Sequence, residues 1–250
     1  SYTFGPFVTN EESFVGRVGA ALPEWDVLNF GVNGYGTDQA QLTYERDARP
    51  YRPTVVVMGY FVRDYTRNLV TFTDYEKPRF VVDGQGLALR NVPVRSPESL
   101  FAAYRSGKRT IAPEPRSYLA AAILRGLARR SRHDLSSDAE GWQVLSRLMA
   151  RFATEAQADG AIPVWLVIPA RDKVEGASRF DGLAARCAAR AEAIGLLCCD
   201  AGPWIADHAR AAPDEPLYRP RADGGHLTAA GNRVLAEGLV DFLRNRVFRD

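Results

Sequence analysis

A continuous run of β-branched residues, Pro53-Thr-Val-Val-Val-Met-Gly59, constrains the fold of this chain more than any other segment. Apolar residues in unbroken succession are typical of a strand that is covered on both faces, as in a parallel sheet between helices. Similar short apolar runs occur at 26–32, 161–168 and 196–200. Helical patterns separate these runs, so the alternation predicts an α/β fold built around a parallel sheet.

Five helices are predicted between and after these strands. They cover residues 10–22, 37–49, 138–159, 177–194 and 228–246. The acidic residues Glu11 and Glu12 favour a helix start near residue 10, because negative charge is stabilised at the positive end of a helix.

One segment, residues 69–116, breaks the alternation and is rich in Pro and Gly. Asp83-Gly-Gln-Gly86 lies in it between two short apolar runs, which indicates a β-hairpin. A segment this long between a strand and a helix is uncommon unless it is functional. We interpret it as an insertion that forms a lid or a substrate rim, and a packed decoration without a catalytic role stays equally open.

The chain has 250 residues, of which 46% are hydrophobic and 25% charged. This length fits one α/β domain, residues 1–250, that carries the 69–116 insertion. The formal net charge of +2 does not indicate a nucleic-acid partner. The Arg-rich stretch 125–132 is interpreted as a solvated helix face and not as a phosphate or membrane patch.

Other sequence features exclude some classes of protein. No run of about 18 apolar residues is present, so the sequence predicts no membrane span. Cys187, Cys198 and Cys199 lie in helical or apolar patterns. They are interpreted as free thiols that serve as small hydrophobic residues, and not as a disulfide or metal framework.

Only three histidines are present, which shortens the search for a general base. His133 and His208 stand in polar surroundings and are interpreted as surface residues. His226 differs, because Asp223 stands three residues before it and the two glycines between them allow a tight turn. A carboxylate that reaches the imidazole would fix its tautomer and stabilise its protonated form. An Asp-x-x-His pair alone is a weak indication, so a nucleophile must be found elsewhere in the chain.

Four segments, in this order along the chain, resemble the sequence blocks of the SGNH, or GDSL, hydrolase family. The segments are Ser1-Tyr-Thr-Phe-Gly5, residues 27–39, residues 55–64 and residues 223–226. The chain begins at the serine of the first block. The order and spacing of the four segments span nearly the whole chain and are far more specific than any one of them.

The resemblance implies a three-layer α/β/α sandwich with a parallel sheet of about five strands, as in flavodoxin-like folds. It implies that Ser1 is the nucleophile, His226 the general base and Asp223 the acid that orients His226. Main-chain N–H groups of Ser1 and Gly34 would bind the oxyanion. No metal or organic cofactor is implied.

The function expected from this resemblance is serine-dependent ester hydrolysis through an acyl-enzyme. The substrate would be an acyl ester, such as an acetyl ester, of a carbohydrate or a lipid, so the expected partner is a small molecule or a glycan. Two alternatives stay open. One is an O-acyltransferase that modifies a polysaccharide, and the other is a carbohydrate-binding domain that has the fold without the chemistry.

The third block departs from the family pattern. Arg63, followed by Asp64, stands where the family has an asparagine that donates to the oxyanion. Arg63 is a candidate donor with a different reach, and Asn68 is a candidate substitute. A structural ion pair between Arg63 and Asp64 is the alternative.

The family's first strand precedes the nucleophile and lies inside the sheet. We therefore expect the natural protein to have residues before Ser1 that include this strand, because its loss would expose strand edges and a core face. Such a segment would also have room for a signal peptide or an anchor. A cell-envelope or secreted location is consistent with the resemblance, and without such a signal the location would be cytoplasmic. The oligomeric state is left open.

Overall fold

The computed structural model describes residues 1–73, 75–84, 86–105, 139–176, 180 and 182–248. Its centre is a parallel sheet of three strands, β1 (Val55–Phe61), β4 (Ile162–Ile168) and β5 (Leu197–Asp200), in the order β1-β4-β5. The central strand β4 pairs with β1 along its whole length and with β5 from Val164 to Val167. All three strands follow the apolar runs of the sequence, so the predicted parallel α/β sheet is confirmed.

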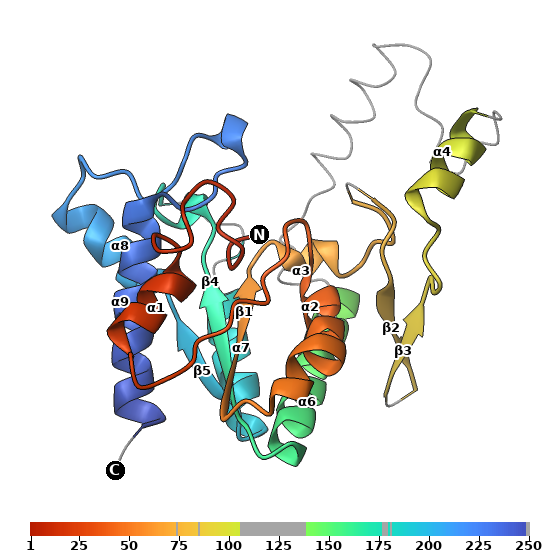
Figure 1. Cartoon of the computed structure of the whole chain (residues 1–250), viewed down its shortest axis with the longest axis horizontal. Helices are drawn as coiled ribbons and strands as arrows, with labels where there is room; N and C mark the ends of the chain where they lie inside the picture. Colours follow the sequence, from red (N-terminus) through yellow and green to blue (C-terminus); the bar gives the residue numbers. More distant parts are fainter. Residues whose placement is uncertain (74, 85, 106–138, 177–179, 181, 249–250) are drawn as a thin grey trace.

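Helices cover both faces of this sheet (Figure 1). The helices are α1 (Phe14–Ala21), α2 (Thr37–Thr43), α3 (Asp64–Arg67), α4 (Pro97–Arg105), α6 (Ala139–Ala158), α7 (Leu183–Ala193), α8 (Gly202–Ala211) and α9 (Ala229–Arg246). Helices α1, α8 and α9 pack on one face, and α2, α6 and α7 on the other. The arrangement is compatible with the predicted three-layer α/β/α sandwich.

Strand β4 shows why its sequence is apolar without interruption. Trp165 and Val167 pack into the cluster that includes α6 and α7. Val164, Leu166 and Ile168 pack into the opposite cluster with α1 and α9. Successive side chains of a strand point to opposite faces, so a strand between two helical layers needs apolar residues at every position.

The sheet has fewer strands than the five or so that were expected, because residues 26–32 form no strand in the described structure. The chain near Thr3 lies between this segment and β1. A Cβ on Gly59 of β1 would lie 2.9 Å from Thr3 Oγ1, and one on Gly31 would lie 2.5 Å from Phe4 N. Segment 26–32 is therefore kept from the edge of β1, and Leu28 in it is 52% exposed.

The predicted insertion begins with the expected hairpin, β2 (Arg79–Asp83) paired antiparallel with β3 (Gly86–Arg90). Phe80 of β2 packs against Val144 and Leu148 of α6, so the hairpin lies against the main body. Residues 106–116, the last part of the insertion, and the Arg-rich stretch 125–132 lie outside the described residues.

The predicted helices form, and α1 differs most clearly from its predicted start. Helix α1 begins at Phe14 because the Ser13 hydroxyl, and not a group near residue 10, accepts a hydrogen bond from Gly16 N at 3.1 Å. The helical segment from Thr37 continues past α2 through a π-helical turn and a 3-10 turn to Tyr51. Helices α6 and α9 match their predicted ranges within about two residues, the usual scatter of helix ends.

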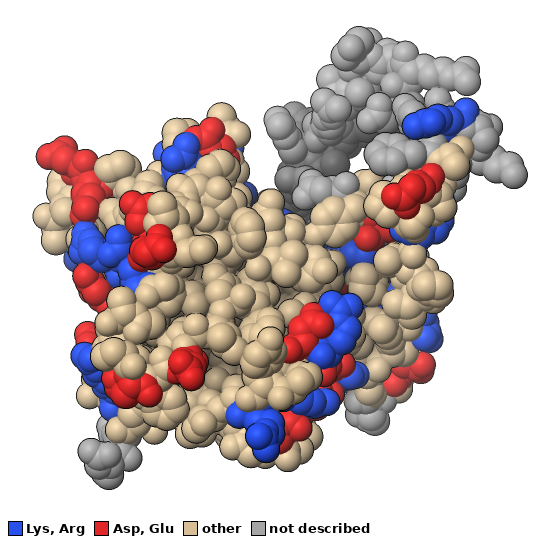
Figure 2. All heavy atoms as spheres, viewed as in Figure 1, with Lys and Arg blue, Asp and Glu red and all other residues tan. Residues whose placement is uncertain are grey.

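The structure also bears on the length of the helices, the state of the cysteines and the distribution of surface charge. None of the helices in the described part of the chain is long and apolar enough to cross a bilayer. The three cysteines are free thiols, and burial raises the pKa of Cys198 to about 11. Figure 2 shows that charged side chains gather toward the margins of the face in view, while its centre is nearly free of them.

Candidate active site

Ser1 and His226, from opposite ends of the chain, meet beside the end of β1. Ser1 Oγ lies 2.9 Å from His226 Nε2, and both side chains are partly buried. A narrow pocket opens next to Ser1. It is lined by Ser1, Tyr2, Thr3, Phe30, Gly31, Val32, Tyr35, Gly36, Ala40, Gly59, Phe61 and Asp64. The pocket lies at the carboxyl end of β1, where ligands bind in open α/β sheets.

Tyr2 holds Ser1 in place. Its ring stacks on Phe61 of β1 with 4.0 Å between the ring centroids. Its hydroxyl donates a hydrogen bond to the carbonyl oxygen of Gly225 at 2.9 Å. Tyr2, the residue next to Ser1, is therefore fixed both to the sheet and to the turn that carries His226.

His226 is presented by a tight turn just before α9. Gly224 and Gly225 have φ angles of +78° and +67°, a region that favours glycine. A Cβ on Gly224 would lie 2.9 Å from the imidazole, so only glycine leaves room for the ring. After the turn, Thr228 caps α9 by accepting a hydrogen bond from Gly231 N at 3.1 Å.

The structure brings Asp223 to His226 through the main chain and not through the carboxylate. His226 Nδ1 lies 3.3 Å from the carbonyl oxygen of Asp223. The Asp223 carboxylate instead pairs with Arg219 at 2.9 Å. A carbonyl oxygen only accepts hydrogen bonds, so this contact places the ring proton on Nδ1. Nε2 is then free to accept the proton of Ser1.

Burial lowers the pKa of His226 below its ordinary value of 6.5, and the hydrogen bond to Asp223 opposes this shift. The imidazole is therefore neutral at neutral pH. A neutral imidazole with its unprotonated Nε2 at a serine hydroxyl has the protonation state that a general base needs.

The segment 31–36 forms one wall of the pocket, as the resemblance to the second block implies. Gly34 has a φ of +82°, and a Cβ on it would lie 2.8 Å from the hydroxyl of Tyr75, a residue of the insertion. Gly34 itself is not among the pocket-lining residues, whereas Gly31 and Gly36 are. The structure thus brings the predicted oxyanion segment to Ser1, with Gly34 facing Tyr75.

The two residues of the third block take different positions. Arg63 is exposed and its side chain makes no hydrogen bond or ion pair within the described residues, so the alternative ion pair with Asp64 does not form. Asp64 is buried, lines the pocket and pairs with Arg67 at 3.0 Å. Asn68 is buried behind the pocket, where its Oδ1 accepts a hydrogen bond from Asp38 N at 3.3 Å. Asn68 is therefore not at the oxyanion position.

Asp64 is the most electrostatically perturbed carboxyl beside Ser1. Burial raises its pKa to about 7, although the Arg67 guanidinium and the Ser1 amino group lower it. A carboxyl with this pKa changes its charge within the physiological pH range.

Several residues at the site carry no signal in the sequence. Phe7 lies 5.5 Å from the His226 ring, and the Arg219 guanidinium stands 4.8 Å from the Phe7 ring centroid. Arg67 reaches both Asp64 and the wall of the pocket. The sequence could indicate a role for Tyr2, because it is next to Ser1. It could not indicate one for Phe7, Arg67 or Arg219, because their contacts at the site join segments that are distant in the sequence.

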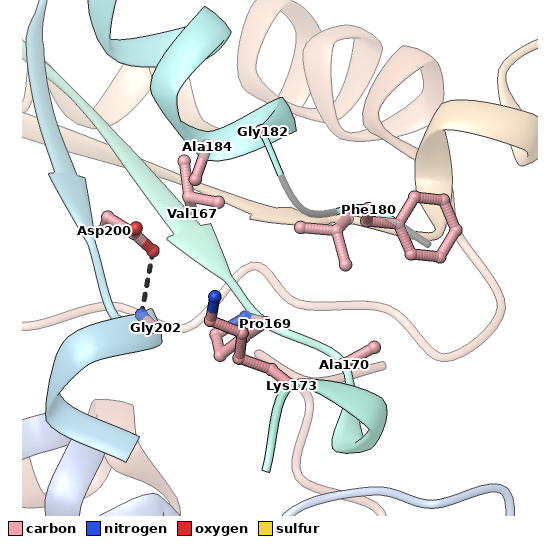
Figure 3. Close-up of a pocket in the computed structure, with 10 residues that line it drawn as sticks. Val167, Pro169, Ala170, Lys173, Phe180, Gly182, Ala184, Asp200 and Gly202 are labelled. Atoms are coloured by element: carbon pink, nitrogen blue, oxygen red, sulfur yellow. Dashed lines mark hydrogen bonds between the residues drawn. The ribbon is translucent and has the colours of Figure 1, made fainter. Parts of the chain in front are cut away.

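A second hollow lies at the ends of β4 and β5 (Figure 3). It is lined by Val62, Val167, Pro169, Ala170, Lys173, Phe180, Gly182, Ala184, Asp200 and Gly202. The Asp200 carboxylate accepts a hydrogen bond from Gly202 N at 2.8 Å, and the Lys173 side chain points into the hollow. Its described lining contains no serine, threonine, cysteine or histidine, so the nucleophile and base occur together only at the Ser1 pocket among these two hollows.

Comparison of the chain with models of protein families, with curated proteins and with solved structures found no match.

Proposed function

We propose that this protein is a serine-dependent ester hydrolase that acts through an acyl-enzyme on Ser1. The observation that carries the proposal is the 2.9 Å contact between Ser1 Oγ and His226 Nε2, residues that are 225 positions apart in the sequence. An accidental contact is disfavoured, because Tyr2 fixes the position of Ser1 and the glycine turn fixes that of His226. Nucleophile and base within hydrogen-bond reach are the signature of an activated serine.

In the acylation step, Ser1 Oγ attacks the carbonyl carbon of the ester while its proton moves to His226 Nε2. The tetrahedral intermediate then collapses, the bond to the alcohol breaks, and His226 gives the proton to the leaving alcohol. The main-chain carbonyl of Asp223 accepts from Nδ1 throughout, which orients the ring. Water then attacks the acyl-enzyme with His226 again as base, and the carboxylic acid is released.

The oxyanion would be bound at Ser1 N and the 31–36 wall. Gly34 of this wall, the donor that the resemblance implies, would have to turn from Tyr75 toward the pocket to take part, and the exposed Arg63 would have to reach in from outside. Ser1 N, an amino group in this structure, donates one hydrogen bond to the carbonyl oxygen of Val32 at 3.2 Å and has further N–H groups that could reach an oxyanion. A donor aimed at the oxyanion is worth about 2.7–4 kcal/mol in such enzymes. The narrow pocket with Phe30 and Phe61 in its wall favours a short acyl group such as acetyl.

The finer fold assignment is part of this proposal. In the flavodoxin-like order 2-1-3-4-5, the strands β1, β4 and β5 would be the last three. Segment 26–32 would take the place of strand 2, and the Ser1 segment lies between it and β1, along the edge where β1 has no partner among the described residues. The order β1-β4-β5 and the Ser1 segment at that edge support this arrangement.

The test is hydrolysis of p-nitrophenyl acetate by the protein and by the Ser1→Ala and His226→Ala variants, each checked for folding by circular dichroism. Turnover that is lost in both variants supports the proposal. A folded protein without turnover, or turnover that survives both substitutions, contradicts it. Acyl transfer to a sugar in place of water would appear as faster nitrophenol release when the sugar is added.

A further inference from the structure

The wall of the pocket opposite Ser1, residues 31–36, is held by donors from outside it. Ser1 N donates to Val32 O at 3.2 Å, and Arg67 Nη1 donates to Tyr35 O at 3.2 Å. Tyr75 of the insertion donates to Asn33 O at 3.1 Å. The segment forms no strand or helix, so these bonds help to fix its main chain, together with local bonds such as those from Gly31 N to Asn29 Oδ1 and from Gly36 N to Gln39 Oε1.

Of these donors, Arg67 also donates a hydrogen bond to a buried carboxylate at the site. The nitrogen that bonds Tyr35 O also donates to Asp64 Oδ1 at 3.0 Å. Glycine at position 36 makes room for the guanidinium stem, because a Cβ there would lie 3.2 Å from Arg67 Cδ and 2.8 Å from Asp38 Oδ1. Asp64, Arg67 and the pocket wall are therefore packed as one unit.

The charged side chains of this unit and behind it form two ion pairs, Asp64 with Arg67 and Asp38 with Lys77. Asp38 of α2 forms a fully buried ion pair with Lys77, whose ammonium also donates to the carbonyl of Arg67 at 3.3 Å. Asp64 thus faces Arg67 on its own helix, Asp38 and Lys77 behind it, and the Ser1 amino group. Arg67 is held at its backbone by Lys77 and at its guanidinium by Asp64.

We propose that Arg67, with Asp64 as its counter-ion, is a positioning residue that fixes the 31–36 wall against Ser1. The effect on catalysis rests on the proposed function, whereas the claim that Arg67 fixes the wall does not depend on it. Loss of the Asp64 charge weakens one of the two hydrogen bonds that this Arg67 nitrogen donates, because a neutral oxygen holds a guanidinium less strongly than a carboxylate does, and the peptide after Tyr35 is then held less firmly. The wall then moves relative to Ser1, and catalysis is slowed without a change in the nucleophile or base.

The experiment compares Asp64→Asn and Arg67→Gln with Arg46→Gln, a charge-matched control on the exposed residue Arg46, which pairs with Asp47. Gly36→Ala is a fourth variant that displaces Arg67 without any change of charge. Hydrogen exchange of peptides that cover residues 31–36 is measured in all of them, together with kcat and KM for p-nitrophenyl acetate.

We expect faster exchange of the 31–36 peptides in Asp64→Asn, Arg67→Gln and Gly36→Ala, and no change in Arg46→Gln. We expect kcat to fall roughly 10- to 100-fold in the same three variants, with KM changed much less, because a small misplacement of a site has this effect. Unchanged exchange overturns the inference, and so does faster exchange with unchanged kcat. A wild-type protein without turnover contradicts the proposed function alone, since exchange still decides whether Arg67 holds the wall.

A pH profile separates this role from a merely structural one. Asp64 has a pKa of about 7, so protonation on acidification discharges it and loosens Arg67. In the wild type, kcat/KM should begin to fall near pH 7 and fall further as His226 is protonated below 6.5. Asp64→Asn lacks the first step, so its profile should fall only at the lower pH. Identical profiles would overturn the inference.

Discussion

At the residue scale, the contact that orients His226 is the feature with the clearest chemical consequence. The motif Asp223-Gly-Gly-His226 predicts a carboxylate at the imidazole, and the turn does bring the two residues together. The carboxylate, however, has a stronger partner in Arg219, which the chain places beside it by a tight turn. The sequence pattern gives no means to foresee this competition, because it depends on side-chain directions within the turn.

Asp223→Asn is therefore expected to lower kcat only modestly, by less than about tenfold. The main-chain carbonyl that accepts from Nδ1 stays in place in this variant, whereas a triad that loses its carboxylate loses about 10⁴-fold in kcat. The measurement is kcat for p-nitrophenyl acetate beside His226→Ala. A loss of 10³-fold or more in Asp223→Asn would show that the carboxylate turns to His226 during catalysis.

The protonation of His226 gives a second prediction at this scale. Burial lowers the pKa of His226, so the folded state binds its proton less readily than the unfolded state does. As the pH falls below 6.5, the unfolded state takes up this proton first, and this residue's contribution to stability is lost. An NMR titration of the imidazole Cε1 proton should give a pKa below 6.5. A value at or above 6.5 would contradict the account of a neutral base.

At the element scale, the strands and long helices follow from local patterns. Continuous apolar runs predict β1, β4 and β5, and Thr228 marks the start of α9 by its hydroxyl. The exception is segment 26–32, which has a strand-like composition and forms no strand. Its pairing depends on a neighbouring strand, and that information is not contained in the segment itself. Helix α8 is not among the helices predicted from the sequence.

The packing of α8 on α9 predicts that a Gly→Ala substitution in a helix lowers the stability of the protein, the opposite of its usual effect. Gly→Ala in a helix interior normally stabilises a protein by about 1 kcal/mol. At Gly238 of α9 a Cβ would lie 2.3 Å from the ring of Trp204 in α8. Gly238→Ala should therefore destabilise the protein by about 1–3 kcal/mol, as overpacking does. Urea denaturation measures this effect.

The control for this prediction is a double-mutant cycle. Trp204→Ala removes the ring with which the new methyl group of Gly238→Ala would clash, so Gly238→Ala should destabilise the Trp204→Ala protein only slightly. If Gly238→Ala is stabilising in the wild type, or equally destabilising in both backgrounds, the helix contact is not as the structure describes it.

At the scale of the whole molecule, two apolar cores on either side of the sheet hold the layers together, and a buried ion pair joins the hairpin region to them. Lys77, just before β2, is fully buried and its only carboxylate partner among the described residues is Asp38 of α2. The sequence predicts the layers from alternation, but an ion pair between residues 39 positions apart has no local pattern. The same is true of Arg67 and its contacts.

Lys77→Met should destabilise the protein by about 3–5 kcal/mol, because it leaves the Asp38 carboxylate buried without a partner. The double variant Asp38→Asn with Lys77→Met should recover much of this loss, since no charge then remains buried. Denaturant unfolding of the wild type and of both variants measures the two effects. A Lys77→Met protein as stable as the wild type would show that the pair is open to solvent.

The central claim is that Ser1 is a nucleophile activated by His226, and covalent trapping tests it most directly. The protein is treated with diethyl p-nitrophenyl phosphate, and the modified residue is located by peptide mass spectrometry. The account predicts a single phosphoryl adduct on Ser1, no adduct in Ser1→Ala, and formation at least about 100-fold slower in His226→Ala. An adduct on another residue, or a wild-type rate no faster than that of His226→Ala, would contradict the claim.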